Sequence, residues 1–247
     1  MSVSAAGRTH LVLVGATGMV GGYALRYALE HPAVERVTAI GRRTLGISHA
    51  KLKEVVHPNF GDCSALAETL LYQDAAIFCL GAYTGAVSEA ELRTITVDYT
   101  VEFARVLHKS SPNAGFSFLS GQGADPTGKS RIAFARYKGE AENALLAAGF
   151  HAVYIFRPAY IYPVKPRKEP NLGYRLLRAI YPVFRMLFPS QVIRADDLAR
   201  VMVDVAVQGT KEPRASVFEN NDIRAMVERV GADAGGSSSG GERARKR

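Results

Sequence analysis

Three glycines near the start of the chain, Gly15, Gly18 and Gly21, have a spacing that suits a phosphorylated ligand. They follow an apolar run at 11–14, typical of a strand buried on both faces of a parallel sheet, and precede a stretch with helical spacing. Glycines in such a turn let backbone N–H groups approach a pyrophosphate at the helix N-terminus. The turn therefore predicts a dinucleotide site, formed by Gly15, Thr17, Gly18, Met19, Val20 and Gly21.

The glycine spacing alone is a weak signal, because GxxGxxG differs from the fingerprint GxGxxG and also suits a turn that only packs a strand on a helix. The residues around the turn strengthen the prediction. A second strand is predicted at 37–40, and Arg42 and Arg43 follow it. A carboxylate at this place accepts from the 2′-hydroxyl of NAD, whereas a guanidinium can pair with the 2′-phosphate of NADP. The two arginines predict NADP(H) as the cofactor, with an exposed basic turn as the alternative.

The elements that position these residues alternate between strand and helix, which predicts one α/β domain with a doubly wound parallel sheet, the Rossmann arrangement. We expect strands at 11–14, 37–40, 54–56, 75–80, 115–119 and 152–156, and helices at 20–30, 88–109, 130–148 and 196–207. Ligands bind beyond the carboxyl ends of the strands in such sheets. The functional residues should therefore lie in the loops after Val14, Ile40, Leu80, Leu119 and Phe156.

The regular alternation stops after Pro158. The proline-rich and basic segment 160–170 predicts a loop, and 172–188, which is apolar and basic, predicts one or two short helices that cover a substrate cleft. Contact of 172–188 with a membrane surface is the alternative. We assign 1–209 to the nucleotide-binding domain with 160–190 as its small cap, 210–233 to a C-terminal extension, and 234–247 to a disordered basic tail.

Composition bounds the compartment and the partners. The chain has 247 residues and 47% hydrophobic content, enough for a large core. Two cysteines and six histidines show neither a disulfide framework nor ligand spacing, so no metal is expected. Part of the net charge of +8 is in the C-terminal basic cluster, so nucleic acid is not expected as a partner. Without an apolar signal core or a run near the ~20 apolar residues that cross a bilayer, we expect a cytoplasmic protein.

Several motifs occur in the order found in a known superfamily. They are the glycine turn, the loop 78–81, Leu119-Ser120, the segment 138–140 and Arg157-Pro158. On these residues the sequence resembles the short-chain dehydrogenase/reductase superfamily in its atypical NADP-binding branch, from about Leu11 to Gly209. Within that branch it is similar to the subgroup of the Tat-interacting protein, through the segments 79–81, 97–98, 123–125 and 138–140.

The resemblance implies a catalytic Ser, Tyr and Lys, in which the phenol exchanges a proton, nicotinamide carries the hydride, and the lysine lowers the pKa of the phenol. Ser120 and Lys138 match two of these positions. Residues at i and i+4 share a helix face, so the tyrosine should stand four residues before Lys138, but Phe134 stands there. Tyr137, the available phenol, is about 100° around the helix from the lysine. Phenylalanine cannot exchange a proton.

Three interpretations stay open. Tyr137 can swing into the site, since it lies about 60° around the helix from Phe134, or it can be an ordinary surface aromatic. Ser120, a water or Lys138 can supply the proton instead. The protein can also bind NADP without catalysis and report the state of the cofactor to a protein partner.

The resemblance also implies further cofactor contacts. Asp62 would accept from the adenine amino group, with capping of the next helix as the alternative. Leu80 and Gly81 would pass close to the adenosine ribose, and Lys138 would bind a ribose. The last implied pair, Arg157 and Pro158, would shape the wall around the nicotinamide.

The function predicted from these residues is that of an NADP(H)-dependent oxidoreductase acting on a small carbonyl or hydroxyl compound. The alternative is a catalytically weak NADP-sensing regulator that binds a protein partner. Helices 88–109 and 130–148 can pair between subunits of a homodimer, or their apolar faces can simply pack on the sheet.

Overall fold

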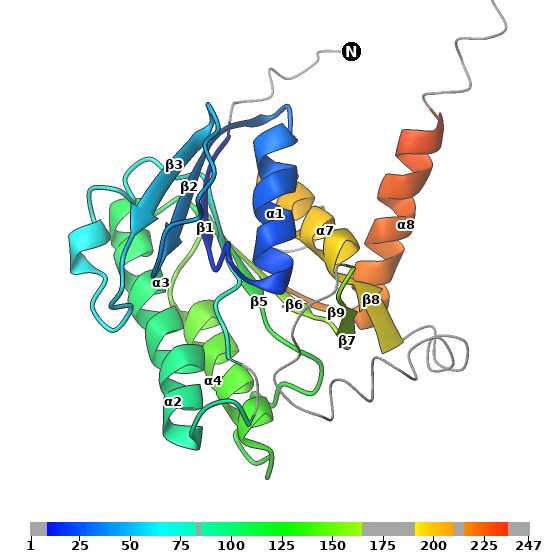
Figure 1. Ribbon diagram of the computed structural model, residues 1–247. Helices are drawn as coiled ribbons and strands as arrows, with labels where there is room; N and C mark the ends of the chain where they lie inside the picture. Colours follow the sequence, from blue (N-terminus) through cyan, green and yellow to red (C-terminus); the bar gives the residue numbers. More distant parts are fainter. Residues whose placement is uncertain (1–8, 83–84, 165–190, 210–214, 237–247) are drawn as a thin grey trace, which may run out of the picture.

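A seven-stranded parallel sheet is the centre of the fold (Figure 1). The computed structural model describes residues 9–82, 85–164, 191–209 and 215–236. The strand order β3-β2-β1-β4-β5-β6-β9 confirms the expected doubly wound parallel sheet. The strands are β1 (Thr9–Val14), β2 (Val34–Gly41), β3 (Leu52–Val56), β4 (Ala75–Phe78), β5 (Gly115–Leu119), β6 (Ala152–Arg157) and β9 (Ala215–Glu219).

Helices cover both faces of the sheet, which is why the central strands are apolar throughout. On one face lie α1 (Met19–Glu30) and α7 (Ala195–Gln208), and on the other lie α3 (Tyr99–Ser110) and α4 (Ala133–Ala147) (Figure 1). Side chains along β1 alternate between two apolar clusters: Leu11 and Leu13 face α1 and α7, while Val12 and Val14 face α3. All four are at most 1% exposed, as the continuous apolar run predicted.

The helix expected at 88–109 is divided into three parts. The helix α2 (Glu89–Arg93) begins after Ser88, whose hydroxyl oxygen accepts from the Glu91 N–H at 3.2 Å. A π-helical turn, η2 (Thr94–Asp98), then joins α2 to α3. Such wide turns occur often at functional sites, and this one places Thr96 on the wall of a cavity described below.

The C-terminal part differs from the expectation. The segment 160–170, predicted as a loop, begins with the strand β7 (Tyr160–Tyr162), which pairs in parallel with β8 (Val192–Arg194). The remainder of the predicted cap, 172–188 included, lies outside the described residues. The edge strand β9 and the helix α8 (Asn220–Gly236) were not predicted. Only Ser216 and Phe218 of β9 are buried, a weaker pattern than the apolar runs of the inner strands.

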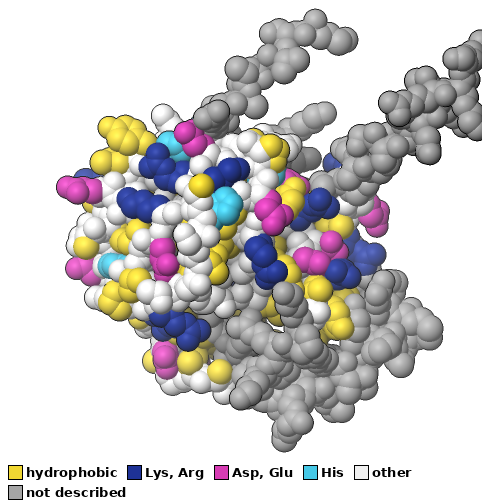
Figure 2. Space-filling model, turned by 45° about the horizontal axis from the view of Figure 1, so that its top comes forward, with side chains coloured by type: hydrophobic (Ala, Val, Ile, Leu, Met, Phe, Trp, Pro, Cys, Tyr) yellow, Lys and Arg dark blue, Asp and Glu magenta, His cyan; other side chains and the backbone are white. Residues whose placement is uncertain are grey.

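The helix α8 continues to Gly236, past position 234 where the disordered tail was expected to begin. The rest of that tail is outside the described residues. On the face of the molecule shown in Figure 2, Lys and Arg side chains are interspersed with Asp and Glu side chains. None of the helices in the described ranges has both the length and the apolar character that a bilayer span requires.

Candidate functional site

The glycine turn brings three elements together at the carboxyl end of the sheet. Gly15 follows β1 with a φ of +89°, and a Cβ on it would stand 2.8 Å from the carbonyl carbon of Cys79, just beyond β4. A Cβ on Gly21, in the first turn of α1, would stand 2.2 Å from the Gly15 oxygen. Side chains at these two positions are therefore excluded. The N-terminus of α1 has no side-chain cap, which leaves its N–H groups for an anion.

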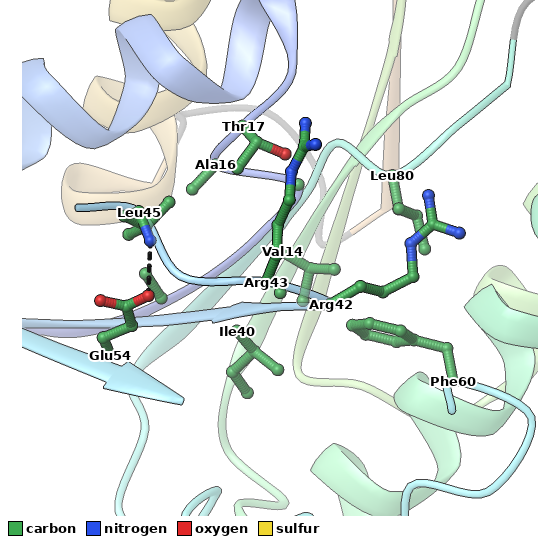
Figure 3. Close-up of a pocket in the computed structure, with 13 residues that line it drawn as sticks. Val14, Ala16, Thr17, Ile40, Arg42, Arg43, Leu45, Glu54, Phe60 and Leu80 are labelled. Carbon is green, nitrogen blue, oxygen red and sulfur yellow. Dashed lines mark hydrogen bonds between the residues drawn. The ribbon is translucent and has the colours of Figure 1, made fainter. Parts of the chain in front are cut away.

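A cavity of about 390 Å³ lies beside this turn (Figure 3). Its walls come from the ends of β1, β2 and β3 and from the segments that follow β3 and β4. The lining residues are Val14, Gly15, Ala16, Thr17, Ala39, Ile40, Gly41, Arg42, Arg43, Leu45, Glu54, Phe60 and Leu80. We call it the arginine cavity. Of the predicted cofactor residues, it brings together Gly15, Thr17, Arg42, Arg43 and Leu80.

The two arginines point to different parts of this cavity. The guanidinium of Arg43 lies beside Thr17, while that of Arg42 extends toward Leu80 and Phe60 (Figure 3). Both side chains are exposed. Glu54 is a cavity residue that sequence reasoning missed; its carboxylate accepts from the Leu45 N–H at 2.6 Å. Its position on an exposed part of β3 gave no signal in the sequence.

Asp62 lies outside the lining of the arginine cavity. Its carboxylate accepts from the Ser64 N–H at 2.9 Å, at the start of the short helix η1 (Ser64–Leu66). Hydrogen bonds from Ser64 lower the pKa of this carboxyl group. Of the two roles considered for Asp62, the observed contact is the one at the start of a helix.

A second cavity, of about 480 Å³, lies on the other side of the glycine turn. We call it the lysine cavity, since the buried Lys138 is on its wall. Leu80 lines both cavities, and the glycine turn lies between them. The lysine cavity is lined by Gly18, Met19, Val20, Cys79, Leu80, Gly81, Ala82, Thr96, Leu119, Ser120, Gly121, Gln122, Phe134, Lys138, Pro158, Ala159, Tyr160, Ile161 and Pro163.

Lys138 is 6% exposed, and its ammonium group is held by the protein. Nζ donates to the Leu119 carbonyl at 2.8 Å and lies 4.5 Å from the centre of the Phe118 ring. Burial lowers the pKa of Lys138 to about 8, against the opposing effect of the Glu142 charge. Lys138 can therefore change its charge close to neutral pH. Burial also raises the pKa of the nearby Cys79 to about 12, so that side chain stays a thiol.

Ser120 is part of a buried polar network behind the same wall. Its hydroxyl donates to Glu142, which is 1% exposed and stands one helical turn after Lys138 on α4. Arg157 donates through Nε to the same carboxylate at 3.0 Å and through Nη1 to Glu219 at 2.9 Å. The hydrogen bond with Glu142 raises the pKa of Arg157 above its usual value.

Arg157 is thus engaged by two carboxylates and is not among the cavity-lining residues, whereas its neighbour Pro158 is. Sequence reasoning did not identify Glu142. The signal that could have found it is the repeat of four from Phe134 through Lys138 to Glu142, because residues four apart share a helix face.

The three candidate catalytic residues are not all brought together. Ser120 and Lys138 line the same cavity, whereas the Tyr137 hydroxyl donates to Glu89 of α2 at 2.9 Å and is not among the lining residues. Phe134 occupies the inner position, and a Cβ on Gly121 would stand 2.7 Å from its Cζ. Besides Ser120 and Lys138, the polar side chains of this wall are those of Thr96, Gln122 and Tyr160, and an aromatic ring stands at position 134, where the phenol was expected.

The two cavities together suit an extended dinucleotide. The backbone of Gly15 and Gly21 leaves no room for side chains, the free N-terminus of α1 faces the turn, and each end of the turn opens into a cavity. No group of three or more His, Cys, Asp or Glu side chains in the described ranges could hold a metal ion.

Comparisons with known proteins agree with this geometry. No family model matches the chain. The protein fmp52, mitochondrial, of Emericella nidulans is 30% identical over 167 residues, which cover 65% of this chain and 70% of the relative. The protein FMP52, mitochondrial, of Kluyveromyces lactis is 25% identical over 224 residues, which cover 88% of this chain and 98% of the relative.

The names of these relatives contradict the expected cytoplasmic location. A third relative, from Candida albicans, is also named as a mitochondrial FMP52 protein. The expectation was based on the absence of an apolar signal core and of a membrane-spanning run. Neither absence bears on mitochondrial targeting, which uses amphipathic, arginine-rich segments.

Two solved structures show the fold. The Bordetella bronchiseptica enzyme WbmG, in complex with NAD, superimposes with a TM-score of 0.64 at 15% identity over 94% of this chain and 81% of that chain. Uronate dehydrogenase from Agrobacterium tumefaciens gives a TM-score of 0.60 at 15% identity over 86% of this chain and 76% of that chain. These two similarities agree with the Rossmann fold of this chain.

Proposed function

This chain belongs to the FMP52 protein family, and we propose that it binds NADP(H) and acts as an oxidoreductase on a small carbonyl or hydroxyl compound. The single observation that carries the proposal is the pair of cavities on either side of the glycine turn, with Lys138 and Ser120 on the wall of one. The binding of NAD by WbmG, which has a similar fold, supports a nicotinamide dinucleotide. A bound nicotinamide would accept or supply a hydride.

The preference for NADP(H) over NAD(H) is proposed from the arginine cavity. Arg42 and Arg43 present two guanidinium groups at the end of β2, and both side chains are exposed. Guanidinium groups bind phosphate through charge-assisted hydrogen bonds. Glu54 lines the same cavity, but its Oε1 is already engaged by the Leu45 N–H. Because the Arg43 guanidinium lies beside Thr17 of the glycine turn, the 2′-phosphate would lie on that side of the cavity (Figure 3).

In the proposed reaction the residues of this chain divide into binding and proton-handling groups. Lys138 would hold a ribose hydroxyl and keep positive charge beside the reacting atoms. With Phe134 at the inner position and the Ser120 proton held by Glu142, the proton would pass to or from Lys138 or a water. Because position 134 lacks the phenol, we expect slow turnover.

Calorimetric titration with NADPH and NADH, followed by an absorbance assay with aldehydes, ketones and quinones, tests the proposal. We expect NADPH to bind at micromolar concentration and at least one compound to accelerate its oxidation. Gly21→Ala is the control, since its Cβ would meet the Gly15 oxygen at 2.2 Å and should abolish binding. If the folded protein releases no heat with any nicotinamide dinucleotide, the proposal is wrong.

A second candidate is a regulator that binds NADP(H) and changes its affinity for a protein partner. Two observations favour it: Phe134 stands where the phenol is expected, and the Tyr137 hydroxyl is engaged with Glu89. The similarity to the subgroup of the Tat-interacting protein would fit this function. Tight NADPH binding without turnover of any compound in the panel favours the regulator, and efficient turnover excludes it.

The names of the relatives also lead us to propose a mitochondrial location. Fractionation of cells that express the chain with a C-terminal tag tests this. Recovery of the protein with mitochondria, protected from added protease or attached to the outer surface, is the expected result. Recovery only in the cytosolic fraction contradicts it.

A further inference from the structure

Ser120 and Glu142 form a buried hydrogen-bonded pair at the wall of the lysine cavity. Ser120 is 6% exposed and Glu142 is 1% exposed, and the Ser120 hydroxyl donates to Oε1 of Glu142. A serine hydroxyl has one proton and two lone pairs. The bond to Glu142 uses that proton. The Ser120 oxygen can therefore offer only lone pairs to a ligand in the cavity.

Arg157 keeps Glu142 in its accepting role. Its Nε donates to Oε1 of Glu142 at 3.0 Å, and its Nη2 donates to Oε2 at 2.5 Å. A guanidinium group has donors and no acceptor, so both carboxylate oxygens must accept. Glu219, on β9, holds Arg157 from the other side at 2.9 Å. The direction of the Ser120 hydrogen bond is thus fixed by residues from α4, β6 and β9.

Lys138 supplies a hydrogen-bond donor beside the acceptor oxygen of Ser120. Its ammonium uses one N–H on the Leu119 carbonyl, and an ammonium has three donors and no acceptor. Ser120 directly follows Leu119, and both Lys138 and Ser120 line the cavity. The wall therefore presents a donor and an acceptor close together. A ligand hydroxyl can use both, since it donates one hydrogen bond and accepts another, whereas a carbonyl oxygen can only accept.

We propose that Glu142 is a positioning residue that makes Ser120 a hydrogen-bond acceptor, so that the lysine cavity selects a ligand hydroxyl group over a carbonyl group. This inference rests on the proposed function, because the hydroxyl belongs either to an alcohol substrate or to a ribose of the dinucleotide. In the first case the alcohol binds more tightly than its ketone. In the second case the hydroxyl contact contributes to the affinity for the dinucleotide itself.

The experiment uses the full chain with the 1,4,5,6-tetrahydronicotinamide analogue of NADP, which has no transferable hydride. Calorimetry gives the affinity for the analogue alone. Ligand-observed NMR then gives the affinities of the complex for matched pairs, cyclohexanol with cyclohexanone and 1-phenylethanol with acetophenone. The variants are Ser120→Ala and Glu142→Gln. Glu140→Gln is the matched control, because Glu140 is on the same helix, is about half exposed and pairs with Arg93 outside the cavity.

If the hydroxyl belongs to the substrate, we expect wild type to bind the alcohols at least about fivefold more tightly than the ketones. Ser120→Ala should bring that ratio below about twofold. Glu142→Gln should lower it at least threefold, because an amide beside a guanidinium turns its oxygen to Arg157 and offers N–H groups to Ser120. A purely structural role of Glu142 would weaken alcohols and ketones equally.

If the hydroxyl belongs to the ribose, Ser120→Ala and Glu142→Gln should both weaken binding of the analogue at least fivefold and leave the alcohol-to-ketone ratio unchanged. If Ser120→Ala changes neither quantity, or Glu142→Gln changes neither, the inference is overturned while the proposed function stands. No binding of the analogue to wild type would overturn the proposed function and the inference together.

Discussion

Gly139 of α4 lies directly against the backbone of Asp125, so closely that a Cβ on Gly139 would stand 2.0 Å from the Asp125 carbonyl oxygen. The Asp125 N–H also donates to the Ala135 carbonyl at 2.8 Å. The loop that follows Ser120 is therefore held on the helix that carries Lys138. The position of Ser120 relative to Lys138 depends on this contact.

Gly139→Ala should destabilise the fold by about 2–4 kcal/mol, because a methyl group cannot be accommodated without moving the loop off the helix. Urea unfolding measures this loss. Gly115→Ala is the control, since its Cβ would meet its nearest neighbour at 3.9 Å, an ordinary contact. Equal stability of the Gly139 variant and wild type would show that the loop is not packed as described.

Phe134→Tyr should increase the rate of NADPH oxidation, by at least about tenfold, if a phenol is the group that the site lacks. The position lines the lysine cavity four residues before Lys138, whose ammonium would favour the phenolate. The rate is measured by absorbance with the carbonyl panel. Phe134→Leu, which adds no hydroxyl, is the control, and a matching increase there would assign the effect to space rather than to acid catalysis.

Lys138→Met should change the pH dependence of stability. Burial lowers the pKa of Lys138 to about 8, below the ~10.4 of an unfolded chain. Between these values the unfolded chain binds the proton and the folded chain does not, so stability rises with pH. Relative to Lys138→Met, the free energy of unfolding of wild type should increase by up to about 3 kcal/mol between about pH 8 and pH 10. A constant difference across this range would contradict the lowered pKa.

The same charge should discriminate between the two redox states of the cofactor. Below about pH 8 the Lys138 ammonium repels the positive charge of an oxidised nicotinamide. The ratio of the dissociation constants of NADP⁺ and NADPH should therefore fall as the pH rises from about 7 to 9. Calorimetry at several pH values measures this ratio. Lys138→Met should show a lower ratio with no such change, and a wild-type ratio independent of pH would refute the prediction.

Arg43→Ala should weaken NADPH binding about tenfold or more and leave NADH binding within about twofold, because only NADPH has the 2′-phosphate. Arg42→Ala should weaken both, since the Arg42 guanidinium extends toward Leu80 and Phe60 rather than toward Thr17 (Figure 3). Titrations with the two dinucleotides test this division of roles. Equal losses for NADPH and NADH in the Arg43 variant would contradict it.

The parallel sheet could be predicted from the sequence because its inner strands are nearly continuous apolar runs between turn residues. β1 and β4 illustrate this, since every residue of β4 is buried. β9 could not be predicted in the same way, because it is an edge strand in which buried and exposed residues alternate over only five positions. The π-helical turn within 88–109 was also missed, since apolar periodicity does not distinguish a wide turn from a regular one.

The candidate site likewise contains residues that the sequence could indicate and contacts that it could not. The family resemblance indicated Ser120 and Lys138 as candidates, and both line the lysine cavity, one just after a strand and the other on a helix. The partners of Tyr137 and Arg157 could not be found, because Glu89 and Glu219 lie 48 and 62 residues away in sequence and meet them only through the packing of the helices and the sheet edge. Contacts of this kind depend on tertiary structure and leave no periodic signal.

The parallel strands β7 and β8 form a two-stranded sheet apart from the main sheet. Tyr160 pairs with Val192 and Tyr162 with Arg194, and Tyr160 and Ile161 line the lysine cavity, while the main sheet continues from β6 to β9. Part of the wall of the lysine cavity is thus carried by a small separate ladder, whereas the wall of the arginine cavity comes from the main sheet and the segments that follow its strands.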